Sequence, residues 1–260
     1  MRFVTRALLM FAAVLMPASS LSAQALEFDE LYPPRRQGVT KRYGPDKWQL
    51  LSLIRASKRG PAPLIAMVGR GCVLDDWMPD MLSRHGYAVA CIDYRDPDEV
   101  GPREAAKDVA RGIAMLQGSE FQKDIRPNAI AIMASGGAAW IAALIGTDPA
   151  IGDGVLAFHA LKGVALVDPD LTDDSEYVVE AKAHVEGINA PSFYLLSVDS
   201  AVGRLSAATS FAKALQNQGT NVETQTMFRP DNRHPRTRFG STTNKPTMDL
   251  RDYLDRTLMP

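Results

Sequence analysis

Residues 128–144 constrain the fold of this chain more than any other stretch. The apolar run from Ala129 to Met133 predicts a buried strand, the small residues from Ala134 to Ala138 predict a tight turn, and an apolar helical segment follows at once. Small residues are needed in such a turn because they tolerate strained backbone and let the helix pack close to the strand. A strand, a sharp turn and a buried helix in direct succession indicate an α/β architecture.

The rest of the chain repeats this alternation of strand and helix. Residues 26–47 are rich in Pro and charge and predict an irregular lead-in. Apolar strands are expected at residues 48–54, 64–68, 87–94, 163–167, 193–198 and 222–228, and helices at 77–85, 102–116, 205–215 and 248–258. Short apolar strands joined by helices predict one doubly wound, mainly parallel sheet covered on both faces. With no internal repeat or long linker, residues 26–260 are expected to form one domain.

The first 25 residues have the features of a secretory signal peptide. Arg2 and Arg6 form a basic start, residues 7–16 are apolar, Pro17 ends the run, and Ala23-Gln24-Ala25 is typical of a cleavage site. The apolar run is too short for a membrane-spanning helix. We therefore expect a protein secreted or exported to the periplasm, which begins at Leu26 and has no membrane anchor after cleavage.

Charge and cysteine content exclude some classes of function. Removing residues 1–25 takes away Arg2 and Arg6 and no acidic residue, which leaves 27 basic and 30 acidic side chains of the 29 and 30 in the full chain. That balance argues against a nucleic-acid-binding protein, which needs a basic excess. Cys72 and Cys91 are either a disulfide, which export permits, or two small buried residues. No spacing typical of a metal site occurs, and no cofactor is expected.

Several segments, in this order, resemble the α/β-hydrolases of the carboxylesterase kind, including feruloyl-esterase-like and hormone-sensitive-lipase-like enzymes. The similar segments are residues 43–46, 61–71, 86–95, Pro102 with Asp108 and Val109, the turn after residue 133, residues 142–149, and His234 with residues 238–240. The resemblance implies a single-domain α/β-hydrolase fold and a serine hydrolase that acts on carboxylic esters. Its mechanism needs a Ser nucleophile, a His base, an acid and backbone N–H groups for the oxyanion.

The nucleophile position of the family can be laid on this chain in two registers. The G-x-S-x-G pattern of the nucleophile elbow falls on residues 134–138 and places Gly136, which has no side chain, at the nucleophile position. A shift by one residue places Ser135 there, with Gly137 correctly spaced and Met133 where a small residue is usual. Ser135 is therefore either the nucleophile or a turn serine bonded to local backbone.

The acid and the base also have to be read from this chain. The position of the family's acid falls on Ala201, and Asp199 lies two residues earlier. Asp168, after the preceding strand, is a second candidate, although an Asp before Pro is also typical of a turn. His234 follows the last long strand, where the family's base lies, while His85, His159 and His184 have no motif around them.

The loop after residue 68 departs from the family pattern as well. Val68-Gly69-Arg70-Gly71 lacks the His that relatives carry, yet backbone N–H groups of Arg70 and of Gly136, the residue after Ser135, remain available as an oxyanion hole. The Arg70 side chain is expected either to contact an anionic group or to point to solvent.

Two functions of different classes follow. One is an exported ester hydrolase with the displaced triad Ser135, Asp199 and His234. The other is a non-catalytic protein on the same fold that binds a small ester or anionic ligand in the former active-site cleft. Arg229, Arg233, Arg236 and Arg238 around His234 would favour an anionic ligand, or they form a solvated charged loop.

Overall fold

The computed structural model describes residues 38–71, 77–152, 154, 156–172, 176–198, 202–227 and 245–259. The chain divides into two compact units, Met1–Arg35 and Arg36–Pro260, and the described residues all belong to the second. The predicted signal peptide, residues 1–25, lies outside the described residues.

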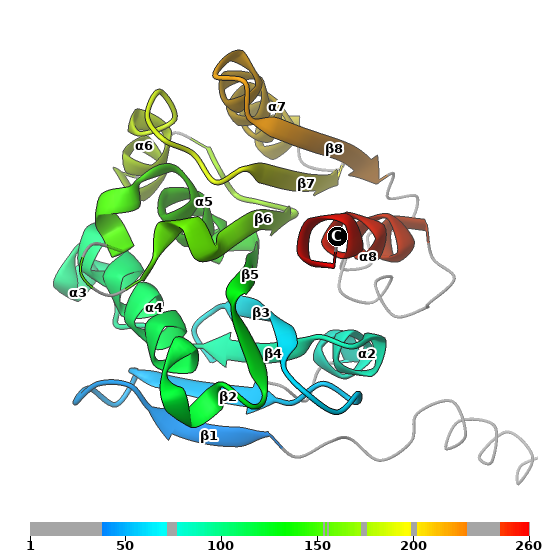
Figure 1. Cartoon of the computed structure of the whole chain (residues 1–260). Coiled ribbons are helices and arrows are strands. Elements are labelled where there is room, and N and C mark those ends of the chain that lie inside the picture. Colours follow the sequence, from blue (N-terminus) through cyan, green and yellow to red (C-terminus); the bar gives the residue numbers. More distant parts are fainter. Residues whose placement is uncertain are drawn as a thin grey trace, which may run out of the picture. The chain divides into compact units, whose positions relative to one another are not determined.

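The core of the domain is an eight-stranded sheet in the order β1-β2-β4-β3-β5-β6-β7-β8 (Figure 1). Strands β3 to β8 run parallel to one another, and β1 and β2 are antiparallel additions at one side. This confirms the predicted doubly wound, mainly parallel sheet. The strands are β1 Val39–Arg42, β2 Leu50–Ile54, β3 Ala62–Val68, β4 Ala88–Ile92, β5 Ile125–Ser135, β6 Leu161–Val167, β7 Ser192–Val198 and β8 Asn221–Met227.

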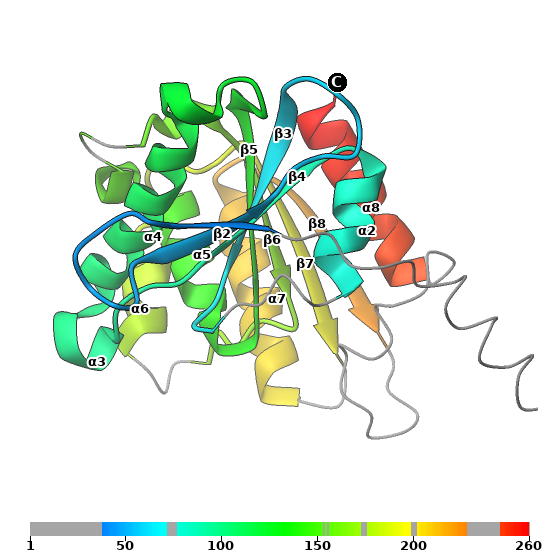
Figure 2. The same cartoon turned by 90° about the horizontal axis from the view of Figure 1, so that it is seen from below.

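Helices cover both faces of the sheet, as Figure 2 shows. Four of them, α4, α5, α6 and α7, share one apolar core with one face, while α2 and α8 share a second core with the other. The helices are α2 Trp77–His85, α3 Pro97–Val100, α4 Pro102–Gln117, α5 Ala139–Thr147, α6 Glu176–Ala183, α7 Val202–Asn217 and α8 Lys245–Leu258. Short 3-10 turns lie at Ser119–Phe121, Gly136–Ala138, Pro149–Gly152 and Phe158–Ala160.

Helix α5 follows the central strand and is buried along its whole length. Its apolar and small residues let it lie directly on the sheet. At Gly146 a Cβ atom would come within 2.7 Å of Val164 Cγ2 and 2.8 Å of Phe193 Cζ, so the contact with β6 and β7 requires glycine. The sequence predicted this helix from its apolar residues, and the close packing explains why they are small.

One prediction about the start of the domain is wrong. The lead-in at residues 26–47 was expected to be irregular, but residues 39–42 form β1, which pairs with β2. Its side chains alternate between half-buried and exposed. An edge strand with only one paired side can carry charged residues such as Lys41 and Arg42, and these residues hide the apolar pattern that identifies inner strands.

Candidate functional site

The strand order places the switch point of the sheet, where a crevice is expected, between the loops that follow β3 and β5. Strand β3 connects towards β4 on one side, and β5 leads into α5 on the other face of the sheet. In open α/β sheets, ligands bind at such a switch point, beyond the carboxyl ends of the strands. The two loops here are Gly69–Gly71 and Gly136–Ala138, the segments in which the resemblance places the oxyanion hole and the nucleophile.

The turn after β5 has the backbone of a sharp strand-to-helix corner. Ser135 is the last residue of β5, in extended conformation with φ −132° and ψ 151°, and it pairs with Val167 of β6. Gly136 follows with φ +56°, and the 3-10 turn leads directly into α5. The left-handed residue of this corner is therefore Gly136, and Ser135 lies on the strand beside it.

Gly136 and Gly137 have free space beside them as far as the described residues go. Apart from their chain neighbours, no described atom lies within 4 Å of a Cβ placed on either glycine. The Ser135 side chain is half-buried and makes no cap hydrogen bond to the following turn. Helix α5 likewise begins without a side-chain cap and without an acidic residue in its first turn. Backbone N–H groups at such a helix start attract a carbonyl oxygen or an anion.

Arg70 lies in the turn after β3, and its side chain is engaged within the protein. Arg70 Nη1 lies 2.7 Å from Asp96 Oδ2, and the guanidinium lies 5.0 Å from the centre of the Trp48 ring. Of the two roles expected for this side chain, the contact with an anionic group is the one observed, and that group is a carboxylate of the protein itself. The pairing fixes the turn against the segment after β4, where the Gly69 N–H also reaches the Ile92 carbonyl at 3.4 Å.

Asp168 follows β6 and is the non-glycine residue with positive φ in the described part of the chain, at +47°. Its N–H donates to the Leu196 carbonyl at 2.6 Å, and its carboxylate lies 3.5 Å from Arg204 Nη1. Asp170 belongs to the same segment, because its N–H donates to the Gly136 carbonyl at 3.1 Å and its carboxylate lies 3.8 Å from Arg204 Nε. The segment after β6 is thus bonded to the elbow itself.

The predicted triad is only partly within the described residues. Asp199, Ala201 and His234 lie outside them. Ser135 and Asp168 are both described, at the ends of the neighbouring strands β5 and β6. Ser135, Asp199 and His234 therefore stay a prediction.

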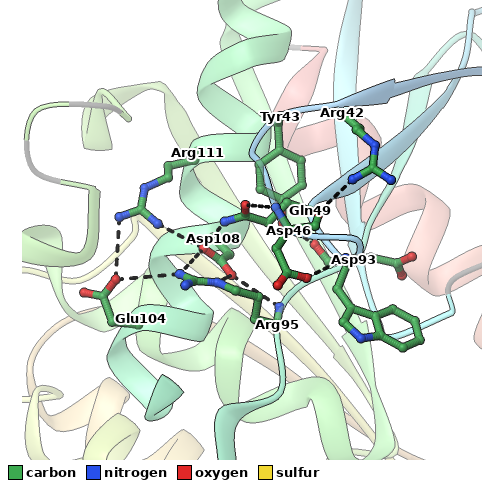
Figure 3. Close-up of polar contacts among 10 residues, drawn as sticks. Arg42, Tyr43, Asp46, Gln49, Asp93, Arg95, Glu104, Asp108 and Arg111 are labelled. Atoms are coloured by element: carbon green, nitrogen blue, oxygen red, sulfur yellow. Dashed lines mark hydrogen bonds and ion pairs between the residues drawn. The ribbon is translucent and has the colours of Figure 1, made fainter. Parts of the chain in front are cut away.

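A second polar cluster supports the crevice from the side of β4 and centres on Asp108 of α4 (Figure 3). The Asp108 side chain is fully buried and accepts five hydrogen bonds. Three come from the Arg95 Nε, Nη2 and backbone N–H at 2.7, 2.8 and 3.2 Å, and one each from Gln49 Nε2 and Arg111 Nη1 at 2.9 Å. Burial alone would raise the pKa of the Asp108 carboxyl, but the hydrogen bonds from Arg95 and Gln49 outweigh it and lower the pKa.

This cluster fixes the segment between β4 and α3. Arg95 is bound by Asp108 (Figure 3). The next residue, Asp96, binds Arg70, and the Tyr43 hydroxyl donates to the Asp93 carbonyl. Burial raises the pKa of Tyr43, so its hydroxyl stays protonated. The sequence comparison included Asp108 and Arg95 among the similar segments but gave neither a role. The available signal was Asp108 itself, a charged residue on the apolar face of α4 between Ala105 and Val109.

Two of the remaining histidines are described with carboxylate neighbours. His85 Nε2 lies 3.1 Å from Asp255 Oδ2, which joins α2 to α8. His184 Nε2 lies 3.6 Å from Asp148 Oδ2 and 3.2 Å from Arg103 Nη1. Within the described residues, no group of three His, Cys, Asp or Glu side chains could hold a metal ion. Cys91 is buried and disulfide-bonded, and Cys72 lies outside the described residues.

Similar solved structures agree on the fold. Esterase B from Lactobacillus rhamnosis (HN001) superimposes with a TM-score of 0.67 at 17% identity, over 93% of this chain and 93% of the esterase. The thermophilic esterase 2 of the planctomycete Thermogutta terrifontis gives a TM-score of 0.68 at 16% identity, over 88% of this chain and 96% of that one. The chain has the α/β-hydrolase fold. No family model matches its sequence, and no curated protein does.

The predicted fold class is therefore confirmed, and the neighbours are esterases by name. Esterase B has also been solved with a tributyrin phosphonate inhibitor, and esterase 2 after phosphoramylation by tabun. At 15 to 17% identity, these structural similarities show a shared fold but do not show a shared activity. In the part of the chain that is described, no helix is both long and apolar enough to cross a membrane.

Proposed function

We propose that this protein is an exported, non-catalytic member of the esterase-like α/β-hydrolases, which binds a small ester or anionic ligand in the crevice between the β3 and β5 loops. The observation that carries the proposal is the φ of +56° at Gly136. A nucleophile elbow presents its catalytic residue on the strained turn between strand and helix. In this chain the residue with that backbone conformation has no side chain.

Loss of the nucleophile removes most of the catalysis of a triad. When the nucleophile or the base of a serine hydrolase triad is deleted, the rate falls by roughly a millionfold, and only binding and the oxyanion hole contribute what remains. The open space at Gly136 and Gly137 and the uncapped start of α5 are retained. These features favour a ligand carbonyl or carboxylate that accepts hydrogen bonds from the turn.

The second candidate is an ester hydrolase that uses Ser135, Asp199 and His234. The observation that favours it is the position of Ser135, half-buried at the carboxyl end of β5 and without a cap bond that would occupy its hydroxyl. For this triad to work, the Ser135 Oγ must come within about 2.6–3.2 Å of a His234 nitrogen. Its extended backbone aligns it with the strand and not with the tip of the turn.

Labelling with a fluorophosphonate probe separates the two candidates. We expect the purified protein to remain unlabelled and to hydrolyse p-nitrophenyl butyrate no faster than its Ser135→Ala variant. Gly136→Ser places a hydroxyl at the tip, where there is room for it, and serves as the variant in which labelling is sought. Labelling of the wild-type protein that disappears in Ser135→Ala would establish the displaced triad and overturn the proposal.

Binding is tested separately from catalysis. Butyrate and phenyl acetate serve as probes in ligand-observed NMR, and Gly137→Trp is expected to abolish their binding because its side chain fills the crevice. Lys213→Trp, at an exposed position of α7, is the matched control and should bind both probes like the wild type. Equal binding by the two variants, or no binding of either probe by the wild type, would contradict a ligand site in the crevice.

A further inference from the structure

A groove of about 530 Å³ lies between β8 and α8 and uses none of the residues of the elbow. Residues 223–226 form one wall, Lys245, Asp249, Asp252 and Arg256 form the other, and Tyr194 lies between them. Every one of these side chains carries a polar group. The groove is therefore unlike a site for an apolar small molecule, which is lined mainly by hydrophobic residues.

The β8 wall shows that the groove follows the edge of the sheet. Side chains of a strand alternate between its two faces, so four consecutive residues can line one groove only where it runs along the strand's edge. Strand β8 is the last in the strand order and pairs with β7 on its inner side (Figure 1). Among the described strands, none pairs with its outer side. The groove thus borders backbone N–H and C=O groups that an added strand can bind.

The α8 wall is one charged stripe of the helix. Its four groove residues are spaced by four, three and four positions, which places them on one side of α8, next to the stripe that packs in the core. A chain of hydrogen bonds holds this wall against the strand. Tyr194 Oη donates to Gln225 Oε1 at 2.6 Å, and Gln225 Nε2 and Lys245 Nζ both contact Asp249 Oδ2, at 2.5 and 2.6 Å.

The charge of the groove favours a basic partner. The charged side chains that line the groove are the acidic Glu223, Asp249 and Asp252 and the basic Lys245 and Arg256. Glu223 forms a close pair with Arg256, at 2.6 Å, whereas Asp252 is about half exposed and its Oδ1 atom lies 3.5 Å from Arg251 Nη2. Asp252 is therefore the carboxylate most available to a cationic side chain of a ligand.

We infer that this groove binds an extended peptide that carries Lys or Arg side chains and that adds a ninth strand to the sheet beside β8. Main-chain hydrogen bonds to the β8 edge hold the peptide, and a basic side chain that projects towards α8 pairs with Asp252. Four paired residues span about 10 Å at the rise of a strand, which matches the stretch of β8 that lines the groove. This site is independent of the crevice at the elbow.

Fluorescence anisotropy with a designed peptide tests the inference. The probe is a fluorescein-labelled, terminally blocked heptapeptide Thr-Lys-Val-Thr-Val-Lys-Thr. One control peptide has Glu in place of both Lys, and another is N-methylated at alternate residues, which removes the donors for strand pairing. We expect the Lys peptide to bind the purified protein and both controls to bind at least about tenfold more weakly.

Two protein variants with the same change of charge complete the experiment. Asp252→Lys is expected to weaken binding of the Lys peptide about tenfold, while Glu186→Lys, at an exposed position outside the groove, should leave it unchanged. Absence of binding, equal binding of the N-methylated peptide, or equal effects of the two variants would each overturn the inference. So would a homodimer, measured by light scattering, that Asp252→Lys dissociates, because a second copy would then occupy the edge.

Discussion

The two flanks of the crevice are built in contrasting ways. On the side of β4, the buried Asp108 collects five hydrogen bonds, three of them from Arg95, at 2.7 to 3.2 Å. On the side of β6, Arg204 lies 3.5 Å from Asp168 and 3.8 Å from Asp170, and the guanidinium is partly exposed. Beside that loose pair, both Gly136 and Asp168 have left-handed backbone.

The two sides therefore differ in how firmly their backbone is held. Charged hydrogen bonds that are buried and fully paired fix one backbone segment relative to another, and loose exposed pairs do so only weakly. The flank that holds the Arg70 loop is therefore firmly fixed by this network. Next to the turn after β5, Asp168 has a strained left-handed backbone, and the left-handed residue of the turn itself, Gly136, has no side chain.

We call the β4 side of the crevice, with Asp108, the tight flank, and the β6 side, with Arg204, the loose flank. The largest expected effect comes from removing the Asp108 carboxylate of the tight flank. Asp108→Ala leaves Arg95 and Arg111 without their buried partner and should lower the free energy of unfolding by about 3–5 kcal/mol. Urea denaturation measures this change. Asp170→Ala, on the loose flank, is the matched control and should cost less than about 1 kcal/mol. If both variants lost the same free energy of unfolding, the two flanks would not differ in how firmly they are held.

The tight flank should also be the one that responds to acid. The pKa of Asp108 is lowered in the folded protein, so its contribution to stability is complete above the pKa of an unfolded Asp, about 3.9, and is lost as pH falls through the folded value. We expect the wild type to exceed Asp108→Asn in unfolding free energy by a constant amount above about pH 5. The excess should shrink below about pH 4, and an excess that persists unchanged to pH 2.5 would contradict the assignment.

The third prediction concerns two neighbouring glycines of the elbow. Gly136→Ala puts a Cβ on left-handed backbone and should destabilise the protein by about 1–3 kcal/mol. The Gly137→Ala variant has ordinary backbone and free space at that position, so it should be stabilised by about 0.4–1 kcal/mol. Thermal and urea unfolding of both variants measure the two signs. A destabilising Gly137→Ala with a neutral Gly136→Ala would move the tip of the elbow away from residue 136.

Most of the fold was predictable from the sequence, because inner strands and buried helices carry long apolar runs. Residues 77–85 were predicted with the bounds of α2, and residues 64–68 lie within β3. Strand β1 was missed because Lys41 and Arg42 interrupt the apolar pattern that identifies the inner strands. At the site, the order of motifs located the elbow and Arg70. The register between Ser135 and Gly136 depends on a backbone angle that neither residue type determines.

The side chains around the crevice were less predictable, since their partners come from distant segments. Arg70 was expected to contact an anionic group or to point to solvent, but its partners, Asp96 and Trp48, could not be named, because they lie 26 and 22 residues away in sequence. Asp170 reaches the Gly136 carbonyl only because β5 and β6 are adjacent in the sheet. Pairing of this kind follows from strand order, which short motifs do not specify.

The smallest effect is expected at Arg70. Its substitution tests whether the buried hydrogen-bond network of Asp108 extends to the loop after β3. The Arg70–Asp96 pair is about one-third exposed, so Arg70→Ala should cost only about 0.2–1 kcal/mol of unfolding free energy, including the contact with Trp48. Lys47→Ala is the control, because Lys47 contacts the same ring at 5.6 Å. In 1 M NaCl, where charges are screened over about 3 Å, the excess cost of Arg70→Ala should shrink towards that of Lys47→Ala. A loss of several kcal/mol that is insensitive to salt would show that Arg70 belongs to the buried network of Asp108, and the boundary between support and crevice would then lie beyond the β3 loop.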